Sequence, residues 1–388
     1  MHDEYIPYGR HQILPEDIDN VIKTLKGNMI TQGETVPKFE KKIAEKVSSK
    51  FAIAVNSATS ALHLACLALG VEKEDMVWTS PISFVASANC ALYCGARIDF
   101  IDIDPSTGLI DIDKLKIKLE IAAKNDNLPK VIVPVHLAGS SCDMKSIYEL
   151  SKKYYFSIIE DASHAIGGSY NSKPVGCCEY SSITVFSFHP VKIITSGEGG
   201  IATTNSDILA EKLRILRSHG IVKDVNKYKM ENQGSWYYEQ QMLGYNYRLT
   251  DIHAALGLSQ LNRLENIVKE RNRQLNFYKI IFKDLSVNFL KIPKNVNSSV
   301  HLAVVSLSDK YLDKYNIIFE GMREKGVGVQ LHYKPIYKNP YYERFNFKES
   351  DYPGSENYSK SSLSIPLYPG LSSEKQIKVR EIMGGFLK

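Results

Sequence analysis

The sequence has no long hydrophobic run. Nowhere in its 388 residues do apolar side chains approach the ~18 consecutive positions that a membrane-spanning helix needs. Its first residues, MHDEYIPYG, also lack the basic and then apolar pattern of a secretory signal. Hydrophobic residues make up 44% of the chain and charged residues 23%, as in ordinary globular proteins. We therefore expect a soluble, cytoplasmic protein with no membrane partner.

Strong charge and metal-binding patterns are also missing. The net charge is only +5, and no run of lysine and arginine is long enough to bind a nucleic acid, so no nucleic-acid partner is expected. The cysteines form no C-x-x-C pair and no zinc spacing, so they predict no metal site and read as buried thiols of a reducing compartment. The six are Cys66, Cys90, Cys94, Cys142, Cys177 and Cys178.

What the sequence does contain is a regular alternation of short apolar runs and helix-like segments. The predicted strands cover residues 51–55, 76–80, 97–104, 130–135, 156–162, 181–188 and 199–205. The predicted helices cover residues 36–47, 57–70, 84–95, 111–124, 143–154 and 207–220. Strands that alternate with helices predict an α/β fold with a mostly parallel sheet. The strands are apolar at successive positions, which is typical of a sheet covered by helices on both faces.

The pattern changes near residue 225. Residues 225–250 are polar and aromatic with little periodicity, and one long helix is predicted over 251–282. The remainder reads as a smaller α+β unit, with a long loop over the Tyr- and Asn-rich residues 337–360. We therefore expect two domains, a large one over 1–255 and a small C-terminal one over 256–388.

One lysine stands in an unusual place. Lys192 lies in the stretch SFHPVKIITSGEGG, between a strand rich in phenylalanine and a Gly-rich turn. Its stem could lie along apolar surface with the ammonium group in water. Alternatively, the amine is held inside the protein for chemistry. The stretch alone does not decide between the two.

Two further features lie at predicted strand ends. The helix that follows Val55 opens with Ser57, Ala58, Thr59 and Ser60, and a helix N-terminus with hydroxyls can accept a phosphate, although plain N-capping explains the same residues. Asp161 ends another strand, at the edge where α/β proteins bind ligands. Its partner could be a metal, an arginine or a protonated ring nitrogen, or it could cap a helix.

Together these features describe a site for pyridoxal 5'-phosphate. That cofactor needs an amine for its aldehyde, a carboxylate for its ring nitrogen and a cradle for its phosphate. Lys192, Asp161 and the helix start near Ala58 offer these three groups in one α/β domain. Phe84 could provide a flat wall against the ring. The chain carries neither a P-loop nor a dinucleotide-binding fingerprint, so those nucleotide sites are not expected.

With these residues in view, the sequence resembles the DegT/DnrJ/EryC1 family of nucleotide-sugar aminotransferases, in the fold-type I class of pyridoxal phosphate enzymes. The resemblance spans essentially the whole chain. It is carried by the stretches MITQGETVPKFE, NSATSALHLA, SPISFVASANC, EDASHAIG, VFSFHPVKIITSGEGG, LRSHGI, GYNYRLTDIHAALGLSQL and VQLHYKPIY. Ile193, Ser196 and Leu331 depart mildly from the usual residues. These departures leave the aminotransfer chemistry intact and bear only on the stereochemistry of the sugar.

The resemblance implies a role for each matching residue in the cofactor site. Lys192 is the catalytic amine that bonds to the cofactor and then moves a proton between cofactor and substrate carbons. Asp161 pairs with the ring nitrogen, Phe84 stacks on the ring, and His164 sits beside it. The phosphate end is lined by Ala58, Thr59 and Ser187, with Asn246 reaching it from a second subunit of a homodimer.

The same resemblance implies where the substrates bind. The family positions that contact the nucleotide sugar are Tyr8, Asn28, Met29, Ile30, Thr31, Gln330, Leu331, His332 and Tyr333. L-Glutamate is the expected amino donor, and a 4-keto-6-deoxy sugar carried on UDP is the expected acceptor. The alternatives are an aminotransferase for a different, D-configured nucleotide keto-sugar, a pyridoxal phosphate lyase, or a non-catalytic regulator on the same fold. A silent regulator would be expected to have lost Lys192 or Asp161, and both are present.

Overall fold

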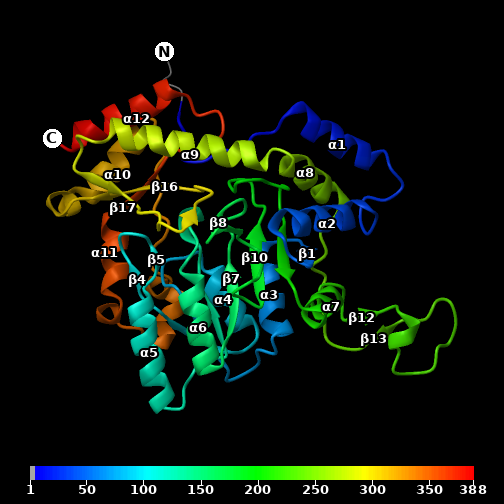
Figure 1. Ribbon diagram of the computed structural model, residues 1–388. Helices are drawn as coiled ribbons and strands as arrows, with labels where there is room; N and C mark the ends of the chain where they lie inside the picture. The colour runs from blue at the N-terminus through cyan, green and yellow to red at the C-terminus, as the bar shows by residue number, and fades with distance from the viewer. Residues whose placement is uncertain (1–4) are drawn as a thin grey trace.

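A seven-stranded sheet forms the centre of the structure, a computed structural model that describes residues 5–388 (Figure 1). Its strands lie in the order β1 (Phe51–Val55), β11 (Gly200–Thr204), β10 (Ile183–Ser187), β7 (Ser157–Asp161), β6 (Val131–Val133), β2 (Met76–Thr79) and β3 (Arg97–Phe100). The pairs from β10 to β3 are all parallel, and only β11 runs antiparallel to its two neighbours. The predicted mostly parallel sheet is confirmed.

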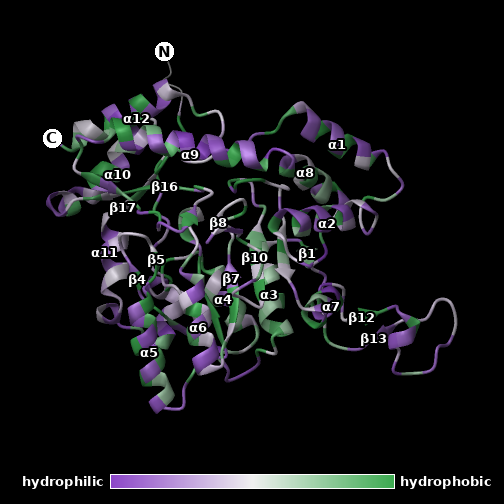
Figure 2. Cartoon of the chain, viewed as in Figure 1, coloured by the Kyte–Doolittle hydropathy of each residue, from purple (hydrophilic) through white to green (hydrophobic). Residues whose placement is uncertain are grey.

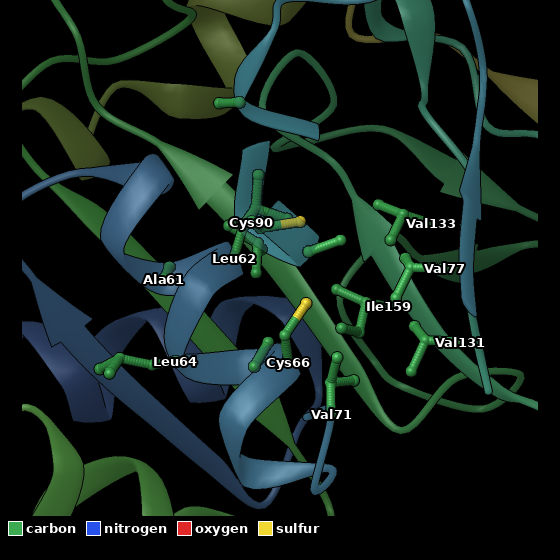
Figure 3. Packing of buried hydrophobic residues seen from close by; sticks show 14 of the residues in the cluster. Ala61, Leu62, Leu64, Cys66, Val71, Val77, Cys90, Val131, Val133 and Ile159 are labelled. Carbon is green, nitrogen blue, oxygen red and sulfur yellow. The ribbon is translucent and has the colours of Figure 1, made fainter. Parts of the chain in front are cut away.

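Helices cover both faces of this sheet. Helices α3 (Ala58–Ala68), α4 (Ala86–Tyr93) and α7 (Asp207–Leu216) share one hydrophobic cluster with the sheet, and α2 (Thr35–Val47), α5 (Ile112–Lys124), α6 (Met144–Tyr154) and α8 (Asp251–Leu261) pack into the clusters of the other face. Neighbouring residues of a strand point to opposite faces. Accordingly Ile159 packs with α3, whereas Ile158 packs with α5 and α6. Figure 3 shows the α3 side of this core.

Helix α3 starts where it does for a local reason and is held in place by its neighbours. Its N-cap residue Ser57 accepts a hydrogen bond from the backbone N–H of Ser60, which fixes the first turn. The helix lies so close to β11 that a Cβ added to Gly200 would be 2.4 Å from the backbone nitrogen of Ala58. Close approach of this kind requires glycine. The start of α3 is therefore fixed against the sheet.

A smaller sheet lies in the C-terminal part, with strands in the order β14 (Val287–Phe289), β16 (Ala303–Leu307) and β17 (Ser362–Ile365). Helices α9 (Leu264–Ile281), α10 (Tyr315–Glu324) and α12 (Ser373–Phe386) pack with it in a separate hydrophobic cluster. The N-terminal arm joins this cluster through Ile6, which bridges to Val327. The division into domains at residue 255 stays a prediction.

Two expected elements differ in the structure. The single helix expected over 251–282 is interrupted between α8 and α9, where Arg263 turns away from helical geometry and its guanidinium binds Asp17 of α1 (Pro15–Leu25) at 2.5 Å. The long loop expected over 337–360 contains α11 (Pro353–Ser361) and short 3₁₀ turns. Tyr337, Tyr342 and Tyr352 of this segment are buried and pack with Phe100, and Tyr352 lies edge-on to it. Aromatic burial thus orders a segment whose sequence reads as polar.

The other elements are short connections around these layers. They are β4 (Ile103–Asp104), β5 (Leu109–Ile110), β8 (Ser169–Tyr170), β9 (Lys173–Pro174), β12 (Ile221–Val222), β13 (Glu239–Gln240) and β15 (Val296–Asn297), with 3₁₀ turns at Leu137–Gly139, Val225–Lys227, Asp309–Lys314, Ile336–Lys338, Pro340–Phe345 and Glu349–Asp351. The surface helices α1 and α9 carry both hydrophilic and hydrophobic colour in Figure 2, as amphipathic helices do. Within residues 5–388, no helix has the length and apolar character needed to cross a bilayer.

Candidate active site

A cavity of about 610 Å³ opens at the carboxyl ends of β7 and β10, beside the N-terminus of α3. Parallel strands bring their carboxyl ends to one edge of a sheet, and this is where ligands bind in α/β proteins. Ten of the residues expected to contact cofactor or substrate line it. They are Tyr8, Ala58, Thr59, Phe84, Asp161, His164, Ser187, Lys192, His332 and Tyr333.

Lys192 follows β10 on a loop and lines the cavity. Lys192 as a whole is half-buried, and the two isoleucines that follow it, Ile193 and Ile194, are buried in the core. Burial lowers the pKa of the Lys192 amine to about 8, although the charge of Asp161 opposes this shift. An amine on a stem that snorkels into water would keep its ordinary pKa. The structure therefore favours the second reading of Lys192, an amine held inside the protein.

Asp161 ends β7 and is buried at the cavity. One carboxylate oxygen, Oδ2, accepts a hydrogen bond from the hydroxyl of Ser87 at 2.6 Å. The other, Oδ1, accepts the hydroxyl of Ser163 at 2.6 Å and its backbone N–H at 3.2 Å. No helix begins after Asp161 in this part of the structure, so the helix-cap alternative is wrong. The serine donors orient the carboxylate instead.

The first turn of α3 faces the same cavity, which residues 56–60 line together. Ser57 caps the helix, as the alternative reading of this stretch expected. The first N–H groups of a helix have no partner within the helix, and their dipole favours an anion. Capping and anion binding are therefore compatible here, because the cap satisfies only one of these donors and the turn opens into the cavity.

Three buried histidines lie beside Lys192 and are kept neutral. Burial lowers the pKa of His332 to about 3, and burial with the charge of Lys192 holds the pKa values of His164 and His301 well below their usual range. The ring of His164 lies 4.3 Å from that of His301, centroid to centroid. A neutral imidazole can accept a hydrogen bond as well as donate one.

The tautomer of His164 follows from its two partners. Its Nδ1 accepts the backbone N–H of Ala138 at 3.3 Å, so the ring proton is on Nε2. Nε2 lies 3.2 Å from the hydroxyl oxygen of Tyr333 and donates to it. The hydroxyl proton of Tyr333 is then free to point into the cavity, where it can serve as a donor to a ligand.

The cavity residues that were not singled out from the sequence include Ser163, Glu198 and His301. Ser163 follows Asp161 by two positions, and an aspartate commonly accepts the backbone N–H of the residue at that spacing, as it does here. Glu198 lies in the Gly-rich turn after Lys192. His301 has no local signal, since its stretch SVHLAVVSL reads as an ordinary strand. It reaches the cavity only because the C-terminal part packs over the sheet.

The remaining predicted contacts lie outside this cavity. Asn246 and residues 28–31 are exposed, and backbone bridges join Asn246 to Ser218 and Thr31 to Thr250. Gln330 pairs with Ser364 through the backbone, and Leu331 next to it is half-buried. The fold of one chain does not bring these residues to Lys192. Their expected roles stay predictions.

Comparison with known proteins agrees with the geometry. The profile of the DegT/DnrJ/EryC1/StrS aminotransferase family matches residues 11–384. The chain belongs to this family. It is 37% identical over 384 residues to UDP-4-amino-4,6-dideoxy-N-acetyl-beta-L-altrosamine transaminase of Campylobacter jejuni, which covers 99% of this chain and 98% of that relative. The family resemblance and the α/β fold expected from the sequence are both confirmed.

Two solved aminotransferase structures share the whole fold. Helicobacter pylori PseC, described as an aminotransferase involved in the biosynthesis of pseudoaminic acid, has a TM-score of 0.90 at 32% identity and covers 99% of both chains. The PLP-form of Spr1654 from Streptococcus pneumoniae has a TM-score of 0.88 at 27% identity, covering 99% of this chain and 100% of its own. The fold is that of fold-type I pyridoxal phosphate enzymes.

Proposed function

We propose that this chain is a pyridoxal phosphate-dependent aminotransferase of pseudaminic acid biosynthesis. It transfers an amino group from L-glutamate to C4 of UDP-2-acetamido-2,6-dideoxy-β-L-arabino-hex-4-ulose and gives UDP-4-amino-4,6-dideoxy-N-acetyl-β-L-altrosamine. One observation supports the chemistry above all others: the amine of Lys192, the carboxylate of Asp161 and the first turn of α3 face one cavity. The name of the Campylobacter jejuni relative supports the choice of sugar.

The donor set of the cavity fits pyridoxal phosphate. Asp161, already oriented by two serines, would hold the ring nitrogen, and the N–H groups near Ala58 would hold the phosphate. The amine of Lys192 would bond to the aldehyde carbon of the cofactor. Phe84, which is 58% exposed, would cover one face of the ring. When bound, the cofactor withdraws electrons from the carbon that carries the transferred nitrogen, which makes its hydrogen acidic.

Residues of the chain would accept and return the proton from this carbon. Because its pKa is about 8, the amine of Lys192 is neutral in roughly a tenth of molecules at pH 7 and in about half at pH 8, and the neutral amine can accept a proton. It can return that proton to the neighbouring carbon from the same position. His164 and His332 stay neutral in this range, so they add no positive charge that would compete for the carboxylate of Asp161.

The acceptor sugar and the second subunit complete the proposal. Tyr8, His332 and Tyr333 line the cavity and would contact the nucleotide sugar. Asn246 and residues 28–31, which are exposed on the single chain, would meet the site of a second copy in a cytoplasmic homodimer. Residues 225–243 support this arrangement, because they form an arm that extends from the body in Figure 1. The arm exposes large apolar side chains, namely Met230, Trp236 and Leu243.

The first experiment is a visible absorption spectrum of the purified protein with pyridoxal phosphate, before and after L-glutamate. We expect a band of lysine-bound cofactor that glutamate bleaches, and a UDP-linked 4-keto sugar that restores it. Recovery with the L-arabino-configured substrate and not with the D-configured 4-keto sugar supports the proposal. The reverse preference would assign a different nucleotide sugar. A band that ignores every amino donor would favour a lyase, and absence of any band would refute the cofactor assignment.

A further inference from the structure

His301 is a buried histidine that enters the cavity from the C-terminal part of the chain, two residues before β16. Its exposed fraction is only 4%. Its backbone N–H donates to the carbonyl oxygen of Ala138 at 2.8 Å, and its own carbonyl oxygen accepts Nη1 of Arg271 at 3.2 Å. The backbone of His301 is thus held by two other segments of the chain, which fixes where its ring enters the cavity.

The two ring nitrogens of His301 have different surroundings. Nδ1 is enclosed by the protein and has no hydrogen-bond partner. Nε2 is not enclosed, and no residue within 5–388 pairs with it, so it is the nitrogen that faces the cavity. A proton on Nδ1 would be an enclosed donor without an acceptor, which is rare in folded proteins. The ring proton therefore belongs on Nε2, where a molecule in the cavity can accept it.

His301 presents this donor without a positive charge. Burial, together with the charges of His164, Lys192 and Arg271, keeps its pKa well below the usual range. The ring of His164, 4.3 Å away between centroids, gives its own Nε2 proton to the hydroxyl oxygen of Tyr333. The Nε2 proton of His301 and the hydroxyl proton of Tyr333 are therefore two neutral donors that remain available to a ligand.

Neutral donors of this kind suit an uncharged oxygen. Carboxylates and phosphates are usually held by arginine or lysine. Within residues 5–388, Lys192 is the only arginine or lysine that lines the cavity, and the proposed cofactor takes its amine. The proposed acceptor sugar carries uncharged oxygens in its keto, hydroxyl and acetamido groups. The sugar therefore matches the free donors of this cavity better than the carboxylates of an amino acid do.

We propose that His301 determines the affinity for the acceptor sugar by donating a hydrogen bond from Nε2 to an uncharged oxygen of that sugar. The inference rests on the proposed function, because it requires a nucleotide sugar in this cavity. It assigns His301 to the second half of the reaction, in which the sugar receives the amino group. The first half, in which the amino acid gives up its nitrogen, does not need this hydrogen bond.

The test measures the two halves of the reaction separately on the cofactor-loaded protein. Stopped-flow absorbance follows the bleaching of the visible band at increasing concentrations of L-glutamate. It then follows the recovery of the band at increasing concentrations of the UDP-linked 4-keto sugar that restores it in the wild type. His301→Phe keeps a ring and removes the N–H donor. We expect the sugar concentration for half-maximal recovery rate to rise ~10-fold, as for the loss of one hydrogen bond, and the glutamate dependence to stay within about 2-fold.

Two further variants separate the hydrogen bond from packing. His301→Gln places an amide N–H donor near the position of Nε2, so its sugar dependence should stay within about 3-fold of the wild type. His63→Phe is the matched control, since His63 is also 4% exposed with an unpartnered ring nitrogen but does not line the cavity. Its sugar dependence should equal that of the wild type. Circular dichroism establishes folding, and His301→Leu removes the same donor with a smaller side chain if His301→Phe does not fold.

The outcomes are distinct. A weaker sugar dependence in His301→Phe, with affinity kept in His301→Gln and glutamate unaffected, supports the inference. An unchanged sugar dependence in a folded variant without the donor overturns it. An equal or larger change in the glutamate dependence, or a shift of the visible band, also overturns it, because the hydrogen bond then belongs to the amino donor or the cofactor. In these cases the proposed function stands. A wild-type protein whose band no UDP-linked 4-keto sugar restores overturns both.

Discussion

Two parts of the predicted site are held in different ways. Asp161 ends one strand of the central sheet and Lys192 lies on the loop after another, so that both face one cavity. Hydrogen bonds from Ser87 and Ser163 fix the orientation of the Asp161 carboxylate. Residues 28–31 and Asn246 are exposed, and their neighbours in the fold contact them mainly through the backbone. Met29 and Ile30 leave about half of their surface in solvent, at 54% and 49% exposed.

The difference indicates that one chain alone positions the cofactor-binding groups, whereas the predicted substrate-binding residues 28–31 and Asn246 need a further contact. The sheet and helix α3 of a single chain are sufficient to gather the groups that do chemistry, since parallel strands end at one edge. Residues 28–31 and Asn246 are not positioned by the sheet of their own chain in this way. Its apolar residues are of the kind that a second copy would cover, and a shared site would follow. The experiments below test this contrast from its strongest consequence to its weakest.

Replacement of Lys192 should have the largest effect. Lys192→Ala removes the amine that holds the cofactor and moves the proton, so we expect turnover to fall by at least about 10⁴-fold. The visible band of lysine-bound cofactor should disappear as well. The control is Lys124→Ala, which truncates an exposed lysine at the end of α5 and should retain full activity. Substantial turnover in a folded Lys192→Ala protein would contradict the assignment.

Mixing two inactive variants tests whether the site is shared. Asn246→Ala should lower turnover by ~10-fold or more while the band of bound cofactor persists, because Asn246 lies outside the cavity of its own chain. In a heterodimer with Lys192→Ala, one of the two sites has both native residues. Random exchange of subunits should then recover about a quarter of wild-type activity. Verified heterodimers that show no recovery would mean that Asn246 acts within its own chain.

The pH dependence of cofactor capture reports the environment of Lys192. Only the neutral amine is a nucleophile, and burial places the pKa of Lys192 at about 8 rather than at its ordinary value near 10.5. The rate at which apo-protein captures pyridoxal phosphate should therefore rise as pH increases through about 8. Stopped-flow absorbance at several pH values measures this rate, with free lysine as the reference. A midpoint equal to that of free lysine would show that the amine is in water.

The same shift predicts how the stability of the apo-protein changes with pH. The pKa of Lys192 is about 8 in the folded state and near 10.5 in the unfolded chain. Between these two pH values the unfolded chain therefore binds more protons than the folded protein. The free energy of unfolding should therefore rise with pH across this interval, and Lys192→Met should reduce the rise. Denaturant titrations of both proteins at pH 7 and pH 9 compare the slopes. Equal slopes would argue against a depressed pKa.

The smallest effect is expected from replacing helix caps, and two caps allow a comparison. Ser57 caps α3 at the cavity, and Ser206 caps α7 away from it. Replacement of either by alanine should lower the free energy of unfolding by ~1 kcal/mol. Only Ser57→Ala should also weaken binding of pyridoxal phosphate, which titration of the apo-protein measures. Equal cofactor affinity in both variants would mean that the first turn of α3 does not hold the phosphate.

The sequence predicted the elements of the large sheet well because their signals are local. Continuous apolar runs such as 51–55 mark strands buried on both faces, and the predicted range matches β1. Gly70, which has a φ of +74°, ends α3 as the sequence indicated. The order of Asp161 and Lys192 along the chain likewise predicted their convergence, since both follow strands whose ends must meet.

Where the prediction was wrong, the cause lies in contacts between distant residues. The break between α8 and α9 coincides with the bonds that Gln260 and Arg263 make to Asp17, far away in the sequence. Order in residues 337–360 comes from packing on Phe100. His301 enters the cavity from the C-terminal part and has no signal within its own stretch.

By itself, then, the sequence determined the alternating architecture, the chemical identity of the site residues and the family, because these depend on residue type and short spacing. Only the tertiary structure decided the protonation of the site. The lowered pKa of Lys192 and the neutral state of His164 depend on burial and on the charges of residues from other elements. The physical reason is that the free energy of a buried charge depends on all the groups packed around it. A pattern of residues along the chain does not show which groups those are.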